Sequence, residues 1–381
     1  MTSFVVHTPL PDFDLWNELE SKSIPVSFEL ELTARCNNDC RHCYINLPAG
    51  DRAAQARELT FDEIVDLADQ AVALGALWCL LTGGEPLLRP DFADIYLALK
   101  RRGLLVSVFS NACLIRPEHI ELFRAYPPRD LEISLYGATA AGYERVSRAP
   151  GSFAAFQRGV RLLEEGGVPA RYKAMALRSN ADEFAAMAEF CRAHTKDVFR
   201  FDPLLHLRYD RDATRNADIV AERLTAAEII ALERADPERT DALRRECRRA
   251  DVAGEPSDAG VLFQCDVGQG FTLGHDGSLR LCSSLWHPDF VADVRREPLA
   301  VAWRRIVGNA RAARSRDAAY LEACAACRLA DLCLWCPAHA YLEVGSLSAP
   351  IDGFCTVAHA RAEAFQDSGE RNPGAVPRDN S

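Results

Sequence analysis

The sequence has no long hydrophobic run and no secretory signal. Its most apolar stretch, residues 71–81, is much shorter than the roughly 20 apolar residues that a helix needs to cross a bilayer. Residues 1–7 also lack the basic segment and the apolar run of a signal peptide. We therefore expect a soluble cytoplasmic protein that has no membrane partner.

Basic residues are in short supply. The 44 Lys and Arg residues face 55 Asp and Glu residues, which gives a formal net charge of −11. Such a chain is a poor general ligand for polyanions, so no nucleic-acid partner is expected. With 381 residues, of which 48% are hydrophobic and 26% charged, the composition is that of a folded protein of two or three domains.

Cysteine, in contrast, is abundant. In a reducing compartment, fourteen cysteines do not form a disulfide framework. Ten of them gather in one N-terminal and one C-terminal group. The other four stand alone in apolar or helical contexts, and we expect them to be small buried hydrophobes: Cys79, Cys113, Cys191 and Cys247.

Short apolar segments alternate with helical patterns between residues 26 and 205. This alternation predicts an α/β fold with parallel strands and right-handed crossovers. Six such units favour a partial (β/α)6 TIM-like barrel over a closed barrel, with reactive groups after the carboxyl ends of the strands. The predicted strands cover residues 26–32, 77–81, 104–109, 131–135, 170–177 and 198–201.

Five segments of different composition divide the chain. Barrel-like alternation gives way to a charged helical stretch interrupted at Pro237, then to a cysteine-rich part with a weak secondary-structure signal, then to a polar tail. The expected units are an N-terminal extension (1–25), a partial barrel (26–220), a helical connector (221–258), a cysteine-rich domain (259–365) and a disordered tail (366–381).

The first cysteine group directly follows the first predicted strand. Cys36, Cys40 and Cys43 are separated by three and two residues, so three thiolates share one tight loop. Three thiolates can bind three irons of a [4Fe–4S] cluster and leave the fourth iron free. A structural zinc site has four ligands. His42 could supply the fourth, so zinc remains an alternative.

The segment from Arg35 to Tyr44 resembles the signature loop of the radical S-adenosylmethionine (SAM) superfamily, and the resemblance extends over about residues 26–210. It implies that Cys36, Cys40 and Cys43 hold a [4Fe–4S] cluster and that SAM chelates the open iron. It also implies reductive cleavage of SAM to a 5′-deoxyadenosyl radical that abstracts a hydrogen atom from a substrate C–H bond. No catalytic side chain is assigned beyond this cluster.

A glycine-rich segment after the second strand, residues 82–86, matches the GGEP motif of the same family. Gly83 and Gly84 allow the backbone to approach a ligand closely, and Glu85 can accept a hydrogen bond from an ammonium group. The family motif implies that this segment holds the amino group of SAM.

Four further residues are candidates for the SAM site. Ser134 and Arg145 are similar in placement to family positions that contact the SAM ribose and carboxylate, although Arg145 could equally be a solvated helix residue. Ser110 could line the same site. Tyr44 could stack near the adenine or only pack beside the cluster.

The C-terminal cysteines resemble the SPASM extension of radical SAM enzymes, which typically carries two auxiliary [4Fe–4S] clusters; a zinc ribbon is the alternative. Two departures from this family pattern affect the assignment of the cluster ligands. Only two residues separate Cys333 from Cys336, and the inner set has three evident cysteines. Its fourth iron could be open, or Asp266 or His275 could bind it. The pattern assigns Cys324, Cys327, Cys333 and Cys355 to an outer cluster and Cys265, Cys282 and Cys336 to an inner one.

The SPASM resemblance implies an oxidoreductase that modifies or crosslinks, through C–S or C–C bonds, a ribosomally made peptide. A separate protein could present the leader peptide, and a flavodoxin or ferredoxin would supply electrons. Trp286, Trp335 and Tyr341 could line a peptide groove or pack in the core. Ser283, where anaerobic sulfatase-maturing enzymes carry Asp, argues against formylglycine formation. The alternatives are modification of a tetrapyrrole side chain or an aminosugar, and a non-catalytic zinc- or cluster-binding scaffold.

Overall fold

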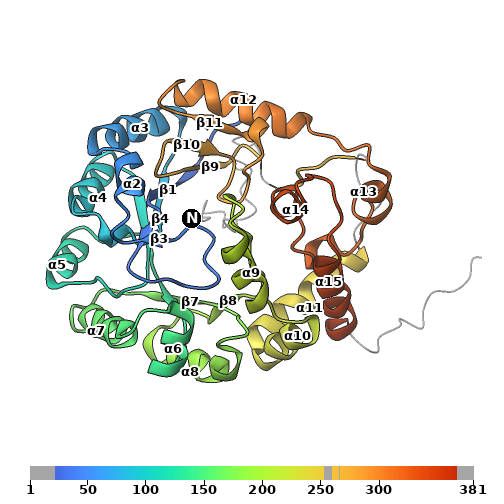
Figure 1. The fold of residues 1–381 in the computed structure, drawn as a ribbon, viewed down its shortest axis with the longest axis horizontal. Helices are drawn as coiled ribbons and strands as arrows, with labels where there is room; N and C mark the ends of the chain where they lie inside the picture. Colours follow the sequence, from blue (N-terminus) through green and yellow to red (C-terminus); the bar gives the residue numbers. More distant parts are fainter. Residues whose placement is uncertain (1–21, 253–259, 266, 367–381) are drawn as a thin grey trace, which may run out of the picture.

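Six parallel strands form an open barrel wall in a computed structural model that describes residues 22–252, 260–265 and 267–366 (Figure 1). The strands pair in chain order, as a succession of strand–helix units requires. The predicted partial barrel is therefore confirmed. Its strands are β1 (Ser27–Thr33), β4 (Trp78–Gly83), β5 (Leu105–Ser110), β6 (Leu131–Leu135), β7 (Arg171–Met175) and β8 (Arg200–Asp202).

Helices cover the outer face of this wall (Figure 1). One of the two longest begins at a capping box, in which Thr60 and Glu63 bond each other's backbone amides, and ends at Gly75 with φ 111°. Two short helices were not predicted: α2 (Arg52–Arg57) and α6 (Ala140–Ser147). The others are α3 (Phe61–Leu74), α4 (Phe92–Arg101), α5 (Pro117–Ala125), α7 (Ser152–Glu165) and α8 (Phe184–His194).

The barrel sheet does not stop at β1. Strand β9 (Gly270–Leu273) pairs in parallel with β1, and β10 (Ser278–Arg280) and β11 (Val291–Asp293) add antiparallel strands beyond it. Phe271 stacks on Phe28, with ring centroids 5.4 Å apart, and contacts the buried Trp303 of α12 (Leu299–Ala312). The sequence did not predict this continuation, which joins the cysteine-rich region directly to the barrel.

Helices form the rest of the C-terminal half. The predicted connector contains α10 (Ala226–Ala235) and α11 (Pro237–Val252), and Pro237 begins α11 as the sequence indicated. A buried ion pair of 2.6 Å joins Glu233 of α10 to Arg361 of α15. The remaining helices are α9 (Ala213–Glu222), α13 (Ala318–Ala323), α14 (Pro337–Val344) and α15 (Asp352–Phe365).

Several expectations concern burial and the chain ends. The four isolated cysteines are buried as predicted: Cys79, Cys113, Cys191 and Cys247. Within the described residues no helix has the length and apolar character needed to span a bilayer. The expected tail from residue 367, most of the N-terminal extension and Asp266 lie outside the described residues.

Candidate functional site

One cavity of about 340 Å³ opens at the carboxyl ends of the parallel strands. This is the location expected for reactive groups in a barrel. The first cysteine loop, the glycine turn after β4 and the ends of β5 and β6 contribute to its wall. Of the residues predicted for the SAM site, it brings together Cys36, Cys40, Cys43, Tyr44, Gly83, Gly84, Ser110 and Ser134.

The three cysteines belong to a loop that starts from β2 (Arg35–Cys36) and returns through β3 (Leu47–Pro48). Burial raises the pKa of Cys36, Cys40 and Cys43, and the neighbouring thiols add to the effect for the first two. Thiolates in this position therefore need a compensating positive charge, which iron supplies. The residues present fit an iron–sulfur cluster.

His42, the candidate fourth zinc ligand, is half-buried, with its Nδ1 shielded from solvent and its ring edge against Tyr136 at 5.7 Å between centroids. Burial lowers the pKa of His42 to about 4, so the imidazole is neutral. Among the described residues, however, no three His, Cys, Asp or Glu side chains converge closely enough to hold one metal ion.

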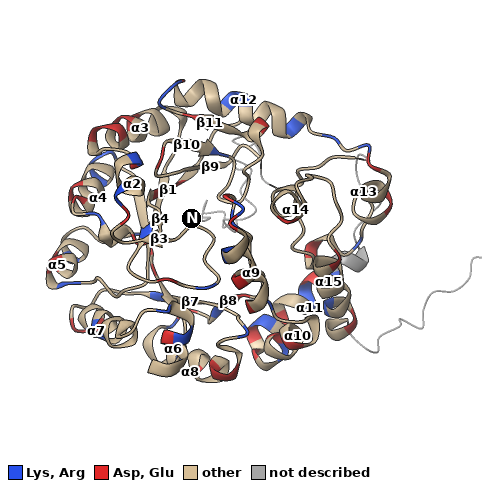
Figure 2. Cartoon of the chain, in the orientation of Figure 1, with Lys and Arg blue, Asp and Glu red and all other residues tan. Residues whose placement is uncertain are grey.

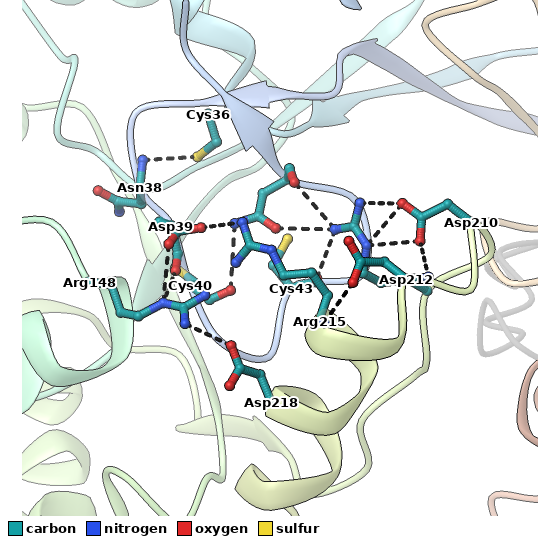
Figure 3. Close-up of polar contacts among 12 residues, drawn as sticks. Cys36, Asn38, Asp39, Cys40, Cys43, Arg148, Asp210, Asp212, Arg215 and Asp218 are labelled. Carbon is teal, nitrogen blue, oxygen red and sulfur yellow. Dashed lines mark hydrogen bonds and ion pairs between the residues drawn. The ribbon is translucent and has the colours of Figure 1, made fainter. Parts of the chain in front are cut away.

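Arginines from distant segments hold this loop in place (Figure 3). The buried Arg208 donates to the backbone oxygens of Cys43 and Asn46, at 3.4 and 3.3 Å, and is itself paired with Asp210 at 2.6 Å. Its contacts connect the chain after β8 to the end of the cysteine loop.

A second set of contacts converges on Asp39, between the first two cysteines. Arg148 donates to the backbone oxygen of Asp39 at 2.8 Å and pairs with Asp218 of α9 at 2.7 Å, while Arg215 pairs with the Asp39 carboxylate (Figure 3). The two arginines come from the ends of α6 and α9. Sequence reasoning missed these residues because their partners are 70 or more positions away.

The close approach of neighbouring backbone requires glycine at both Gly83 and Gly84. A Cβ on Gly83, which has φ 127°, would lie 2.3 Å from the backbone oxygen of Thr33, and one on Gly84 would lie 2.2 Å from that of Arg35. The turn after β4 therefore crosses directly over the strand that leads into the cysteine loop. Both glycines also line the cavity, so only backbone separates a ligand there from β1.

Glu85 is fully buried and does not line the cavity. Its carboxylate accepts hydrogen bonds from Ser110 Oγ at 2.9 Å, the Asn111 amide at 2.8 Å and the Leu87 amide at 3.1 Å. Burial raises the pKa of Glu85 to about 7 against these bonds. In this structure the side chain ties the glycine turn to the turn after β5.

Arg145 also lies apart from the cavity. Its guanidinium bonds to the Ser179 oxygen and pairs with Asp182 at 2.8 Å, and 44% of the side chain is exposed. The structure therefore favours the solvated-helix interpretation. Tyr44, in contrast, is enclosed beside the cysteine loop, with its ring edge toward His206 at 6.3 Å.

The cavity also has a wall of titratable side chains that the sequence analysis did not identify. The residues occupy inward positions of β1, β6, β7 and β8, or follow β8. Alternation along these strands was the signal that could have found them. They are Glu29, Glu132, Lys173, Asp202 and His206.

Six of the seven C-terminal cysteines, all except Cys282, line a second hollow of about 260 Å³. Burial raises the pKa of Cys324 to about 11, and Cys355, Cys333 and Cys327 are its main electrostatic neighbours. Burial likewise raises the pKa of Cys336 to about 12, with Cys282 and Cys265 nearby. Cys324 thus has the other three cysteines of the expected outer set as neighbours, and Cys336 has the other two of the expected inner set, while members of both sets line the same hollow.

His275 was a candidate for the inner set. It is buried, its Nδ1 has no hydrogen-bond partner, and its electrostatic neighbours are Asp276, Glu31 and Glu58. The main electrostatic neighbours of Cys282 are instead Glu29 and Arg280, and Cys282 is itself a neighbour of Cys336. The structure thus does not associate His275 with the three inner cysteines.

The three aromatic candidates for a peptide groove are engaged in packing. Trp286 is stacked on Tyr209 at 3.7 Å and lies under the guanidinium of Arg280 at 3.7 Å. Trp335 donates to the Ala349 oxygen at 2.8 Å, and Tyr341 packs its ring against His287. None of them lines the cavity of the first cysteine loop.

Comparison with known proteins agrees with this geometry. The AdoMet-dependent heme synthase of Methanosarcina barkeri is 26% identical over 83% of this chain and 92% of its own length. The mycofactocin maturase MftC of Mycobacterium ulcerans is 30% identical over 55% of this chain and 54% of its own. Streptococcus suis SuiB bound to its precursor peptide SuiA shares the fold, with a TM-score of 0.66 and 15% identity over 92% of this chain and 82% of its own.

The family described as the Radical SAM superfamily matches residues 30–191. This span includes the cysteine loop, the glycine turn and the strands that surround the cavity. The family implies SAM and a [4Fe–4S] cluster as cofactors. The chain therefore contains a radical SAM domain.

Proposed function

We propose that this protein is an enzyme that cleaves SAM reductively and oxidises a substrate at a C–H bond. The observation that carries the proposal is the single cavity shared by Cys36, Cys40, Cys43 and the glycine pair. The three thiolates would hold the cluster, and the backbone of Gly83 and Gly84 would receive SAM. Together these cofactors would supply one-electron reductive cleavage of SAM to methionine and a 5′-deoxyadenosyl radical, which would remove a hydrogen atom from the substrate.

The protein's own contribution is positioning and exclusion of water. Arg208, Arg148 and Arg215 fix the cysteine loop, and Glu85 fixes the turn beside it. Tyr44 and Ser134 are proposed to contact the nucleoside part of SAM from the cavity wall. An enclosed site of this kind limits side reactions of a radical with solvent.

Two auxiliary [4Fe–4S] clusters are proposed for the C-terminal cysteines. The outer would use Cys324, Cys327, Cys333 and Cys355. The inner would use Cys265, Cys282 and Cys336, with no fourth protein ligand assigned. The mutual proximity of the members of each set supports this division. Such clusters could accept the electron that remains on an oxidised substrate.

The first candidate substrate is a ribosomally made peptide. It is supported by the relationship to a mycofactocin maturase and by a fold shared with an enzyme that was crystallised with its precursor peptide. A second candidate is a small molecule such as a tetrapyrrole. That candidate is favoured by the match to a heme synthase, which extends over most of both chains, whereas the maturase match covers about half of each.

The deciding experiment for the chemistry is anaerobic. The reconstituted chain is reduced with dithionite in the presence of SAM, and 5′-deoxyadenosine and methionine are measured. Cys40→Ala should abolish both products, and Cys79→Ala, which alters a buried cysteine outside the site, should retain them. If the wild-type chain binds iron but forms no 5′-deoxyadenosine, the non-catalytic scaffold becomes the better interpretation.

A further inference from the structure

Lysine is rare in this chain. Of its 44 basic residues only four are lysines: Lys22, Lys100, Lys173 and Lys196. Lys22 and Lys196 are exposed, and Lys100 bonds to the Pro127 oxygen. Lys173 differs from them, because it lies half-buried on β7 and lines the cavity of the first cysteine loop.

The ammonium group of Lys173 has no ion pair or hydrogen bond among the described residues. The nearby carboxylates have other partners: Glu132 pairs with Arg200 at 3.0 Å, and Glu29 accepts from Thr272 at 3.0 Å. Asp202, also on the wall, accepts from the Leu204 amide. Lys173 is an electrostatic neighbour of Glu29 and Glu132, but its ammonium group donates no hydrogen bond to either of them. Its three N–H groups therefore remain available to a ligand that carries negative charge.

The register of the sheet places Lys173 beside the proposed SAM site. Ser134 of β6 pairs with Lys173, and Lys173 pairs with Arg200 of β8. One row of side chains thus runs from the SAM-contacting wall to the last strand of the sheet. A substrate group held at Lys173 would be next to the position where hydrogen abstraction is proposed.

A third hollow, of about 410 Å³, adjoins this row of side chains at the open edge of the barrel. Lys173 and Asp202 line both hollows, so the two are neighbours through these residues. Figure 2 shows both basic and acidic segments on the neighbouring helices α10 and α11. The charged residues that line this third hollow are the basic Lys173, Arg200, Arg239 and Arg245 and the acidic Asp202 and Glu238.

The two arginines from α11 differ in their contacts. Arg239 pairs with Glu233 at 2.9 Å and lies over the ring of Phe201. Arg245 is exposed and makes no ion pair within the described part of the chain. Arg200 and Arg239 are each paired with a glutamate, so the basic groups of this hollow without an ion pair among the described residues are Lys173 and Arg245. These two groups would attract an acidic substrate to this side of the barrel.

We propose that the substrate carries a carboxylate and that Lys173 binds this carboxylate inside the barrel, after access through the basic edge between β8 and α11. This inference rests on the proposed function, because it concerns the substrate of the same cavity. The carboxylate could belong to an acidic peptide side chain or to an acidic tetrapyrrole, and the test separates these sources.

The test measures binding to the reconstituted, SAM-loaded full chain with two matched pairs of probes. One pair is coproporphyrin III and its tetramethyl ester. The other is a hexapeptide with two glutamates and its glutamine analogue, both acetylated and amidated so that the side chains alone differ in charge. In at least one pair the acid should bind about tenfold or more tightly than the neutral probe, as a charge-assisted hydrogen bond predicts.

The variants identify the residue responsible. Lys173→Met should reduce the affinity for the acid probe to that for its neutral counterpart and leave the affinity for the neutral probe unchanged. Lys173→Arg should retain most of the preference for the acid. Lys196→Met, the same substitution on an exposed lysine, should behave like the wild type. The pair of probes that shows the effect identifies the source of the carboxylate.

Three outcomes would overturn the inference: no preference for the acid in either pair, a preference that survives in Lys173→Met, or a loss of SAM affinity in that variant. The last would mean that Lys173 serves SAM itself. In each case the dithionite-driven cleavage of SAM by the wild type reports separately on the proposed function, which fails only if no 5′-deoxyadenosine forms.

Discussion

Arg208 and Cys43 are 165 residues apart in sequence, yet the guanidinium of Arg208 donates to the backbone oxygen of Cys43 at 3.4 Å. The same guanidinium reaches the backbone oxygen of Asn46 at 3.3 Å and is neutralised by Asp210. A cation that is 3% exposed in this position gives the end of the cysteine loop a fixed shape. The shape of the cysteine loop therefore depends on the chain that follows the last barrel strand.

Replacing Arg208 should weaken cofactor retention. In Arg208→Lys the ammonium cannot reach the two oxygens and Asp210 together, because it lacks the planar fork of the guanidinium. We expect the free energy of unfolding to fall by about 3 kcal/mol and iron to be lost faster on anaerobic desalting. Arg161→Lys, on the exposed face of α7, is the control. Equal iron retention in both variants would contradict a role for Arg208 in holding the loop.

Iron and acid-labile sulfide should report the number of clusters directly. Three [4Fe–4S] clusters require about 12 irons and 12 sulfides per chain after reconstitution. The double variant Cys324→Ala/Cys333→Ala should lose about four irons, and Cys282→Ala should affect a different set. About eight irons in the wild type would mean that the three-cysteine set is not a full cluster. About four irons accompanied by zinc would exclude both auxiliary clusters.

Replacing Gly84 and Gly308 by alanine should change the stability of the fold in opposite directions. Gly84→Ala places a Cβ 2.2 Å from the Arg35 oxygen, so we expect a loss of about 2–3 kcal/mol of stability and weaker binding of SAM. Gly308→Ala, in the middle of α12 with nothing within 4 Å of the new Cβ, should raise stability by about 0.5–1 kcal/mol. Urea unfolding of both variants and SAM binding by calorimetry test the contrast. A neutral Gly84→Ala would refute the close crossing.

The ion pair between Glu63 and Arg295 should make stability depend on pH in the acid range. The hydrogen bond from Arg295 lowers the pKa of Glu63 to about 2, below its value in the unfolded chain. The carboxylate therefore stabilises the fold above pH 4.5, and this stabilisation is lost as the pH falls toward 2. Because a third of the side chain is exposed, we expect about 0.5–1 kcal/mol at pH 7.

Glu63→Gln isolates this effect, since glutamine can still complete the capping box with Thr60. The difference in unfolding free energy between wild type and variant, measured by urea titration, should shrink from pH 7 to pH 3. Glu165→Gln, an exposed residue at the end of α7, should show no such trend. A difference that is constant with pH would assign the loss to the cap alone.

The sequence predicted the elements whose signals are local. Six strands and the capped helix at Thr60 follow from alternation and end signals over ten to fifteen residues. The cysteine loop and glycine turn were found because their residue types are unusual. Lys173 was missed although it alternates with the buried residues of β7, because inward and outward faces of a short strand look alike until its neighbours are known.

Features that depend on distant partners could not be predicted in this way. Strands β9 and β10 have four and three residues, and β9 is defined by pairing with β1 some 240 positions earlier. Glu85 was expected to face a ligand, but in the fold it accepts three hydrogen bonds from its own chain. Arg145 was expected near SAM, whereas its partners Ser179 and Asp182 lie on the loop after β7.

The pairing of β9 with β1 has a consequence for engineering. Cys282 follows β10 by two residues, and β10 is joined through β9 to the strand that leads into the first cysteine loop. Backbone hydrogen bonds, and not a linker, thus set the spacing between the barrel and the C-terminal cysteines. A chimera that exchanges the C-terminal region would have to cut through a continuous sheet, so grafts that keep β1 and β9 from the same parent should be the ones that fold.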